Sequence, residues 1–558
     1  MNDDFDAVEP VDDAPAANTL DRKGFVEKAG VTSLGLLLLG ATGSGALAAP
    51  LRKNRVLTKL KGGPKGWAGA ARYQYDANSA PGRAIAAAKR LKKDGKAPDT
   101  LVVGLYAGSV GNYTLPYPKG ATPPAKLWEQ ETGIKIKFVP VQPENAYSKA
   151  IRMAATKDGS QHIVQLGMAD TGDLAEAGLL LDLGQYVGRY KPDWNDPKWG
   201  YIGGPNTTQM FNYYNGKPYA VASDGDFQLY TIRQDLWDNS KEQKDFKAKY
   251  GYALEPPKTW DQMADMAEFF TRPNKKLLGA TDLRGPAWGW INFIHRYVST
   301  ANPVAYYFDD DMKPLINGPG GLKAFNHLKA TTKYGLKDAL STFWPQQYQN
   351  WGDGGSAQTI AFNNITKFMK KGGPFDKSKF DVGSKTWAIP TPGWRVNGKL
   401  VRHTSIYFNA SNGVNKFSPS KYHEAAYLFL QWVASGHIYT WLTANPGGYQ
   451  DPGKNACLKD PLVRSAYTGR TMDVLAMTTP GAVPSITALK GANEYIQALD
   501  VNLLKGLSGQ LSPQATLDAI AKAWEKTTNK VGREKQAAAW RASLKGWPKV
   551  ADSAKGKV

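Results

Sequence analysis

Two aspartates, Asp224 and Asp226, lie in a predicted turn between two strands, with a single glycine between them. Carboxylates at this spacing suggest three kinds of chemistry: acid and base catalysis, metal binding, or acceptance of hydrogen bonds from ligand hydroxyl groups. Neighbouring turn residues rarely flank one scissile bond from opposite sides, so we expect ligand binding rather than glycoside hydrolysis at this turn. A hydrolase that uses two carboxylates distant in sequence remains an alternative.

Other catalytic and metal-binding patterns are missing from the sequence. The six histidines do not form an H-E-x-x-H spacing, and the chain contains neither a G-x-S-x-G nor a G-x-x-x-x-G-K-[ST] motif. Cys457 is the only cysteine and has no basic or histidine neighbour in sequence that would activate it. The acidic run at 308–318 lacks the calcium-loop spacing. We therefore predict no catalytic residues, no cofactor and no metal site.

Amphipathic aromatic residues are abundant, with 17 Trp and 27 Tyr against 19 Phe. Several lie beside glycine or proline in the predicted loops GNYTLPYP, GPAWGWINF and NPGGYQDP. A ring in a loop can lie against the C–H face of a sugar while nearby carboxylates and amides bind its hydroxyl groups. Trp288 and Trp290 fit this pattern, although residues two apart could also pack on opposite faces of a strand. Together with Asn363 and Asn364, these features favour a binder of neutral polyols.

The sequence around these residues predicts an α/β arrangement of helices and strands. Apolar or alternating segments at 101–106, 134–141 and 162–167 predict strands, and a helical segment at 123–133 joins the first two. This succession indicates a parallel sheet whose loops meet at the carboxyl ends of the strands. Later helices have clear start signals, including a capping box at Thr259. We expect ordered structure to begin near Asp99.

The N-terminus has the features of a signal peptide. Residues 1–48 combine a basic patch, a modest apolar segment and an A-x-A ending, so we expect cleavage after Ala48 or Ala49. The patch resembles the twin-arginine pattern through Arg22 and Phe25, whereas Lys23 replaces the second arginine, and the Sec route is the alternative. No apolar run is long enough to span a bilayer, so we predict a soluble periplasmic protein.

The chain is strongly basic, with a formal net charge of +21. Because residues 1–48 carry three basic and eight acidic side chains, the mature chain would have a charge of +26. Much of the excess falls in a basic arm at 49–98. Behind an export leader this arm indicates no nucleic-acid partner; we expect it to be solvated or in electrostatic contact with the membrane surface. The positive charge also keeps a phosphorylated polyol open as the ligand.

The order of several segments resembles the extracellular solute-binding proteins of carbohydrate ABC transporters, the family of maltose-binding protein. These segments include LWEQETGIKIKFVPV, AEAGLLLDLGQY, NGKPYAVASDGDFQLYTIRQDLW, PPKTWDQM and SPSKYHEAAYLFLQWVAS. The resemblance implies a two-lobed periplasmic-binding-protein fold with hinge strands and a ligand cleft between the lobes. It also implies a non-enzymatic, monomeric receptor that delivers a carbohydrate to a membrane permease.

The resemblance further implies domain limits and site residues. Lobe 1 would comprise 99–223 and 400–447, and lobe 2 would comprise 226–397 and 450–550, with crossings near 223–226, 398–405 and 446–450. The implied ligand-binding residues are Tyr113, Asp170, Asp224, Asp226, Trp288, Trp290, Asn363, Asn364, His403 and Tyr449, with Arg402 beside the second crossing.

Overall fold

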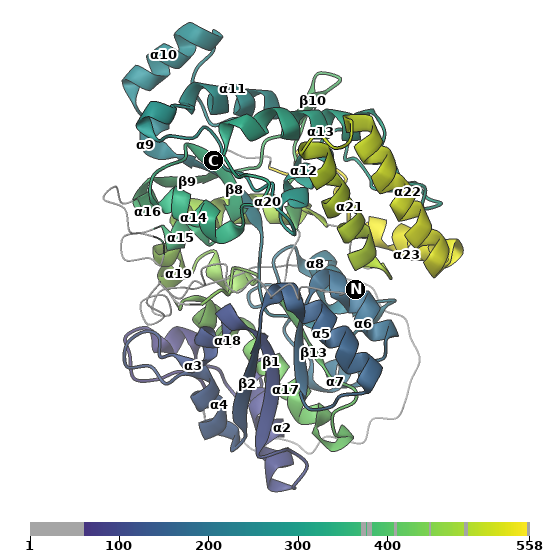
Figure 1. The fold of residues 1–558 in the computed structure, drawn as a ribbon. Helices are drawn as coiled ribbons and strands as arrows, with labels where there is room; N and C mark the ends of the chain where they lie inside the picture. Colours follow the sequence, from purple (N-terminus) through teal and green to yellow (C-terminus); the bar gives the residue numbers. More distant parts are fainter. Residues whose placement is uncertain are drawn as a thin grey trace, which may run out of the picture.

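The computed structural model describes residues 61–369, 375, 382–406, 410–445, 448–484 and 489–554. The predicted export leader lies outside these residues. The described chain forms two α/β lobes, one built mainly from the first part of the chain and the other from its middle and end (Figure 1). No helix among the described residues combines the length and the apolar character needed to cross a membrane.

Lobe 1 is built on a five-stranded sheet with the order β2-β1-β3-β13-β6. Strand β1 (Thr100–Tyr106) pairs in parallel with β2 (Lys135–Val141) and β3 (Ile163–Gly167), as predicted. Helices α4 (Pro124–Thr132) and α5 (Pro143–Thr156) make the parallel connections. Strands β6 (Val221–Ala222) and β13 (Ala410–Val414) are antiparallel additions contributed by the segments that link the lobes.

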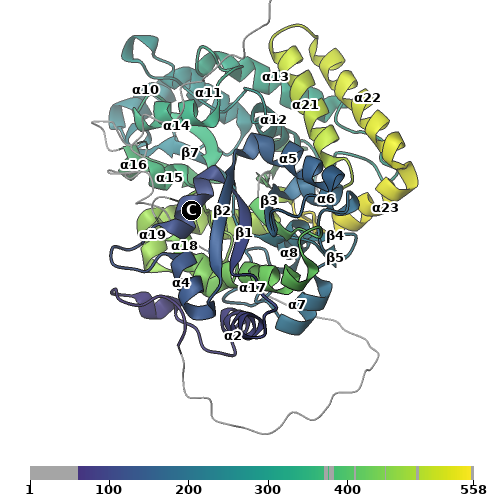
Figure 2. The same cartoon turned by 60° about the horizontal axis from the view of Figure 1, so that its bottom comes forward.

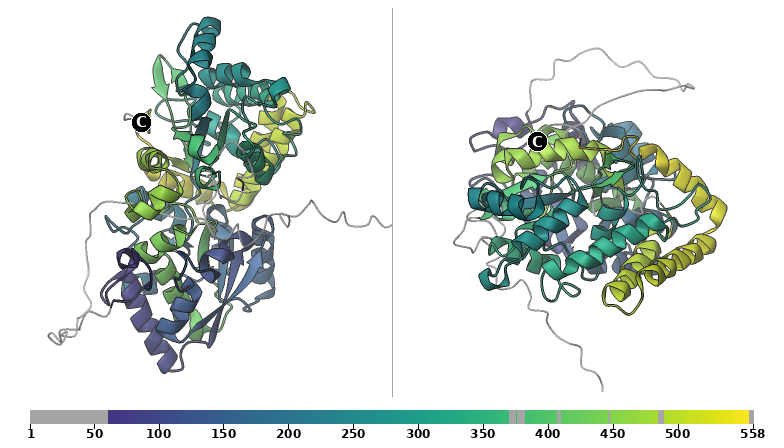
Figure 3. Two further views of the ribbon diagram at one scale, coloured as in Figure 1. Left: turned by 90° about the vertical axis from the view of Figure 1, so that its left-hand side faces the viewer. Right: turned by 90° about the horizontal axis from the view of Figure 1, so that it is seen from above.

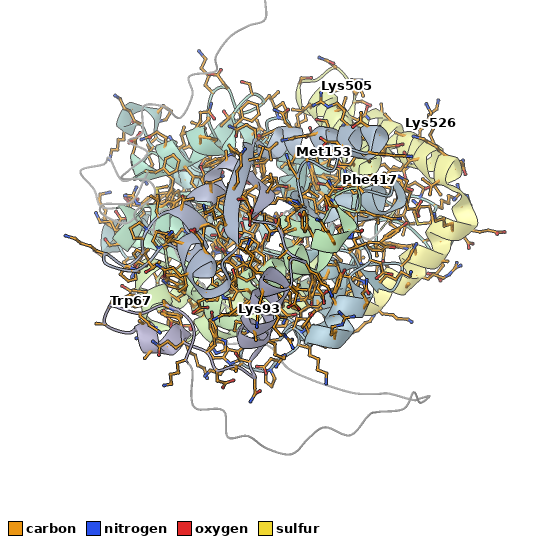
Figure 4. All side chains as sticks on the ribbon, turned by 90° about the horizontal axis from the view of Figure 1, so that it is seen from below. Trp67, Lys93, Met153, Phe417, Lys505 and Lys526 are labelled. Atoms are coloured by element: carbon orange, nitrogen blue, oxygen red, sulfur yellow. The ribbon has the colours of Figure 1, made fainter. Side chains whose placement is uncertain are left out.

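Residues 61–98, the described part of the basic arm, belong to lobe 1, so the expectation that order begins near Asp99 is wrong. Helix α2 (Ala80–Lys93) packs its alanine stripe against α17 (His423–Val433) at the base of the lobe (Figure 2). Buried Tyr73 donates a hydrogen bond from its hydroxyl group to Asp460 Oδ1 at 3.0 Å. The basic side chains, such as Lys93, remain on the outer surface (Figure 4). Small apolar residues between lysines hid this amphipathic helix from the sequence analysis.

Lobe 2 has a smaller sheet with the order β8-β7-β9, in which β7 (Gln228–Arg233) lies between two antiparallel neighbours. The neighbours are β8 (Gln358–Phe362) and β9 (Thr386–Ile389). Helix α11 (Trp260–Phe270) starts at the predicted capping box and covers this sheet with its apolar stripe. The buried residues around it form a core separate from that of lobe 1.

The C-terminal helices extend lobe 2 with a second apolar core. Helices α21 (Ala492–Leu507), α22 (Pro513–Val531) and α23 (Arg533–Ser543) pack beside α12 (Gly289–Tyr297) and α13 (Pro319–Thr331). They form the outer side of the lobe (Figure 3). This arrangement buries Trp290, which lies on α12, in the second core of lobe 2.

Three segments connect the lobes. Residues 223–227 join β6 to β7, and the chain returns from the β10–β11 hairpin (Trp394–Val396 and Lys399–Val401) to β13. The third crossing comes later than the predicted 446–450, because Asn455 still donates its backbone N–H to Gly200 of lobe 1. Helix α20 (Gly469–Thr478) then packs against β9 in lobe 2.

Candidate ligand-binding site

A pocket of about 130 Å³ lies between the lobes, where the first crossing meets the loops of both sheets. At roughly 30 Å³ for each water molecule in the liquid, this volume corresponds to about four water molecules, so it can accept a small solute. Loops after β1 and β2 supply one wall, and residues around α12, α14 (Trp344–Gly352), β8 and α15 (Ile365–Phe368) supply the other. The described lining residues are Tyr106, Gly108, Ser109, Gln142, Pro143, Glu144, Asp224, Asp226, Trp288, Trp344, Tyr348, Phe362, Asn364, Phe368 and Tyr449.

Aromatic rings make up much of the pocket wall. Trp288 meets Phe362 edge to face, with ring centroids 5.8 Å apart and an interplanar angle of 85°. Trp344 meets Tyr449 in the same way at 5.9 Å and 90°. Edge-to-face contacts hold each ring in one orientation, so the faces that remain open to the pocket are preorganised.

Carboxylates lie at the hinge end of the pocket. Asp224, Asp226 and Asp451 each offer an oxygen atom, and these atoms lie within 4.8 Å of one another. Asp224 Oδ1 accepts hydrogen bonds from the backbone N–H groups of Gly225, at 2.8 Å, and of Asp451, at 2.5 Å. The first crossing is therefore bonded directly to the segment around Asp451.

Asp451 is held by a network of buried side chains. Its Oδ2 accepts a hydrogen bond from Asn364 Nδ2 at 2.7 Å, and its Oδ1 accepts one from the Tyr467 hydroxyl group at 2.8 Å. Lys367 Nζ lies 3.8 Å from Asp451 Oδ1 and donates hydrogen bonds to the Tyr467 hydroxyl group and to the Gly448 carbonyl group. Lys367 therefore balances part of the negative charge from behind the pocket.

Burial shifts the pKa values of these groups toward their neutral forms. Desolvation raises the pKa of Asp451 to about 6, while the Lys367 charge opposes this shift. The pKa of Asp224 is well above its usual range because of burial and then of the Asp451 charge; burial and the Asp224 charge do the same to Asp226. Desolvation lowers the pKa of Lys367 to about 8.

The three carboxylates have a spacing that could hold a metal ion. Both oxygens of Asp451, however, already accept hydrogen bonds from uncharged donors, and the Lys367 ammonium group occupies the cationic position beside it. Hard cations prefer oxygen ligands whose lone pairs are free for coordination. The arrangement therefore suits donors of hydrogen bonds better than a metal ion.

The structure brings several of the predicted residues together. Asp224, Asp226, Trp288, Asn364 and Tyr449 all line the pocket, although they come from four separate segments of the chain. Asn363 lies behind the lining, where its Nδ2 donates a hydrogen bond to the Gly225 carbonyl group at 3.1 Å. That bond ties the first crossing to the end of β8.

Other predicted residues lie away from the pocket. Tyr113 packs against Phe138 and Phe429 in the core of lobe 1, and Trp290 is buried in the core of lobe 2. Asp170 follows β3, but its carboxylate accepts hydrogen bonds from the Gly167 backbone N–H and from an asparagine of α21. Their apolar or already bonded surroundings assign these residues to folding.

His403 and Arg402 hold the C-terminal segment rather than a ligand. His403 Nε2 bonds to the Pro303 carbonyl group at 2.7 Å, and its Nδ1 bonds to Ser553 Oγ at 2.5 Å. Arg402 pairs with Asp552 at 3.1 Å. Both side chains therefore belong to a tether between the second crossing and the end of the described chain.

Lys367 and Asp451 were not predicted as site residues from the sequence. Asp451 follows Tyr449 by two residues in a loop already selected for its aromatic residue, so its position was a usable signal. Lys367 is a lone basic residue in the apolar segment ITKFM, and an isolated charge in such a segment indicates a buried partner. Trp344 and Tyr348, four residues apart on α14, gave only the pattern of a core-facing helix.

Comparison with solved structures places this architecture in a known class. The structures include a ribitol-bound ABC transporter solute-binding protein from Agrobacterium radiobacter K84, with a TM-score of 0.58 and 18% identity, covering 76% of this chain and 98% of the other. Maltose-bound MalE3 of T. maritima has a TM-score of 0.61 and 16% identity, and the match covers 76% of this chain and 98% of the other. The GacH receptor of Streptomyces glaucescens, solved with and without acarbose, has a TM-score of 0.58 and 17% identity. The match covers 77% of this chain and 98% of the other. Two lobes around a pocket thus define a solute-binding fold.

The family assignment comes from the sequence profile. Residues 113–435, more than half of the chain, match the family described as bacterial extracellular solute-binding protein. The chain belongs to this family, and the predicted resemblance and two-lobed α/β fold are confirmed. No curated protein sequence matches the chain at a significant level.

Proposed function

We propose that this protein is the extracytoplasmic receptor of an ABC importer for a sugar or polyol. The observation that carries the proposal is the pocket between the lobes, which combines aromatic walls with a cluster of buried carboxylates and amides. Such a pocket can stack on the C–H faces of a polyhydroxylated ligand and accept hydrogen bonds from its hydroxyl groups. The solved structures with bound ribitol and maltose support this class of ligand.

Delivery to a permease would depend on closure of the two lobes when ligand binds. A ligand that contacts both walls favours the closed arrangement, and the closed lobes present a different surface to a membrane partner. Membership of an extracellular family supports an exported location. The monomeric state, the export route and contact of residues 49–98 with an anionic surface stay predictions.

The geometry of the aspartate cluster favours binding over hydrolysis by a pair of these aspartates. The carboxylate oxygens of Asp224, Asp226 and Asp451 lie within 4.8 Å of one another and are linked through the backbone of Asp451. A glycosidase instead needs two carboxyl groups roughly 5 to 9.5 Å apart on opposite sides of the scissile bond. A phosphorylated ligand is also disfavoured, because the described lining residues include acidic side chains but no lysine or arginine.

Calorimetric titration of the mature protein with ribitol, mannitol, glucose and maltose tests the proposal. We expect at least one of these ligands to bind at micromolar or lower concentration, to compact the protein in solution scattering, and to be recovered unchanged by mass spectrometry. Recovery of a cleaved product, or no binding to any sugar or polyol, would contradict the proposal.

A pair of tryptophan variants locates the site. Trp288→Leu removes a ring from the pocket wall and should weaken binding about tenfold, the effect of roughly 1.4 kcal/mol of lost ring contact. Trp387→Leu is the control, because Trp387 lies on β9, where Arg470 covers its ring at 3.7 Å, and is not among the lining residues. Equal affinities for the two variants would place the ligand elsewhere.

A further inference from the structure

The pocket wall is rich in acidic side chains among the residues that the structure describes. Asp224, Asp226 and Glu144 line it, and none of the described lining residues carries a basic side chain. Among the residues that the structure describes, Lys367 is the lysine whose ammonium group acts on these carboxylates; it lies behind the wall and is only 1% exposed. Burial raises the pKa of Asp224 and of Asp226 and so favours their neutral forms in the empty pocket, whereas a cationic ligand would favour their charged forms.

The rest of the wall suits a cation as well. Seven of the described lining residues are aromatic, namely Tyr106, Trp288, Trp344, Tyr348, Phe362, Phe368 and Tyr449. The face of an aromatic ring attracts a cation, most strongly in a site from which water is excluded. Aromatic rings and carboxyl groups around one small pocket can therefore stabilise an ammonium group from several sides.

We infer that the natural ligand carries a protonated amine, as an amino sugar or an amino polyol does. This inference rests on the proposed function and narrows its ligand class. The ammonium group would lie against Asp224 and Asp226, while the hydroxyl groups of the ligand would contact the remaining polar lining residues. The high net charge of the mature surface does not oppose this, because salt screens charges beyond about 8 Å under physiological conditions.

Binding of such a ligand would be linked to protons. Burial raises the pKa of Asp224 and of Asp226 in the empty protein, and an ammonium group beside them would lower it again, releasing protons to the buffer. Other titratable groups also act on these two carboxyl groups through their charge or hydrogen bonds. They are Asp451, Lys367, Tyr113, Tyr348, Tyr439 and Tyr467.

The test compares ligand pairs that differ only in an amino group: sorbitol with glucamine, and glucose with glucosamine. Calorimetry on the full mature protein at pH 7, where both amines are largely protonated, should give an affinity at least tenfold higher for an aminated member than for its hydroxyl partner. Its binding enthalpy should vary with the ionisation enthalpy of the buffer, as expected for proton release. At pH 5 the preference for glucamine should shrink, because protons compete more strongly with the ligand for the two carboxylates while an alkylammonium group stays charged below about pH 10.

Two variants separate charge from shape. Asp226→Asn keeps the size of the side chain and should lower the preference for the aminated ligand at least fivefold. Asp170→Asn is the matched control, since Asp170 is equally buried and hydrogen-bonded but lies outside the pocket. The Asp170→Asn variant should keep the preference of the unmodified protein for the aminated ligand.

The outcomes distinguish this inference from the proposed function. If the hydroxyl member of each pair binds as tightly as the aminated member, the inference is wrong and the sugar receptor stands. If no member of any pair binds, and the neutral panel fails too, both are wrong. If Ca²⁺ or Mg²⁺ alone raises the melting temperature and Asp226→Asn abolishes that rise, the negative pocket serves a metal ion and the inference is overturned.

Discussion

Gly225, between the two aspartates of the first crossing, should not tolerate a side chain. A Cβ atom at this position would lie 1.9 Å from the Pro452 carbonyl oxygen and 2.5 Å from the Gly453 nitrogen. Cβ atoms essentially never approach other heavy atoms within 3.0 Å, so Gly225→Ala must move the two backbones apart by about 1 Å. This displacement would break the bond from the Asp451 N–H to Asp224, and the bond from Asn363 to the Gly225 carbonyl group.

The expected cost follows from those contacts. Overpacking costs about 1–3 kcal/mol, and each lost hydrogen bond adds about 1 kcal/mol, so we expect a loss of about 3 kcal/mol in the free energy of unfolding. Displaced carboxylates should also weaken ligand binding by about 10-fold to 100-fold, since hydrogen bonds to charged groups contribute about 1.5–3 kcal/mol. Urea denaturation and calorimetry measure the two effects separately.

Gly188 in α7 (Gly184–Tyr190) provides the control. Its added Cβ would meet no atom within 4 Å, and Gly188→Ala should stabilise the helix by about 0.5–1 kcal/mol without changing affinity. If Gly225→Ala unfolds at the urea concentration of the unmodified protein and binds ligand with unchanged affinity, the close contact of Gly225 with Pro452 does not constrain the hinge. The same conclusion follows if the two alanine variants behave alike.

Three further predictions concern buried groups elsewhere. Asp282→Asn would leave its two buried arginine partners without a counter-charge and should lower the free energy of unfolding by about 3–5 kcal/mol in urea denaturation. A loss under about 1 kcal/mol would contradict this prediction. Burial lowers the pKa of His437 to about 4, so its neutral form adds stability above pH 6.5 that is lost as the pH falls; His437→Phe should remove about 2 kcal/mol of the loss between pH 7 and pH 5. An unchanged pH dependence would show that His437 is not the group responsible. Tyr73→Phe removes the hydrogen bond to Asp460 and should cost about 1 kcal/mol, whereas an unstructured basic arm would give no change.

The strands and many of the helices could be predicted because their signals are local. The alternation at 134–141 and the capping box at Thr259 each occupy a few residues, and the structure confirms both elements. Helix α2 was missed because its buried face consists of alanines, whose hydrophobic signal is weak beside the surrounding lysines. The burial of that face depends on α17, more than 300 residues later in the chain.

The sequence by itself determined the α/β class, the family and the turn that carries Asp224 and Asp226. It did not determine which polar residues would join them, because Lys367 and Asp451 reach the network behind the pocket only through the β7–β8 pairing and the hydrogen bonds between the crossings. Tyr113, Trp290 and His403 had the right residue types in the right kind of segment, but the tertiary structure buried them in cores or in the C-terminal tether. Residue type sets the chemistry that a side chain offers, whereas its charge balance and access to a ligand depend on neighbours brought together by long-range packing.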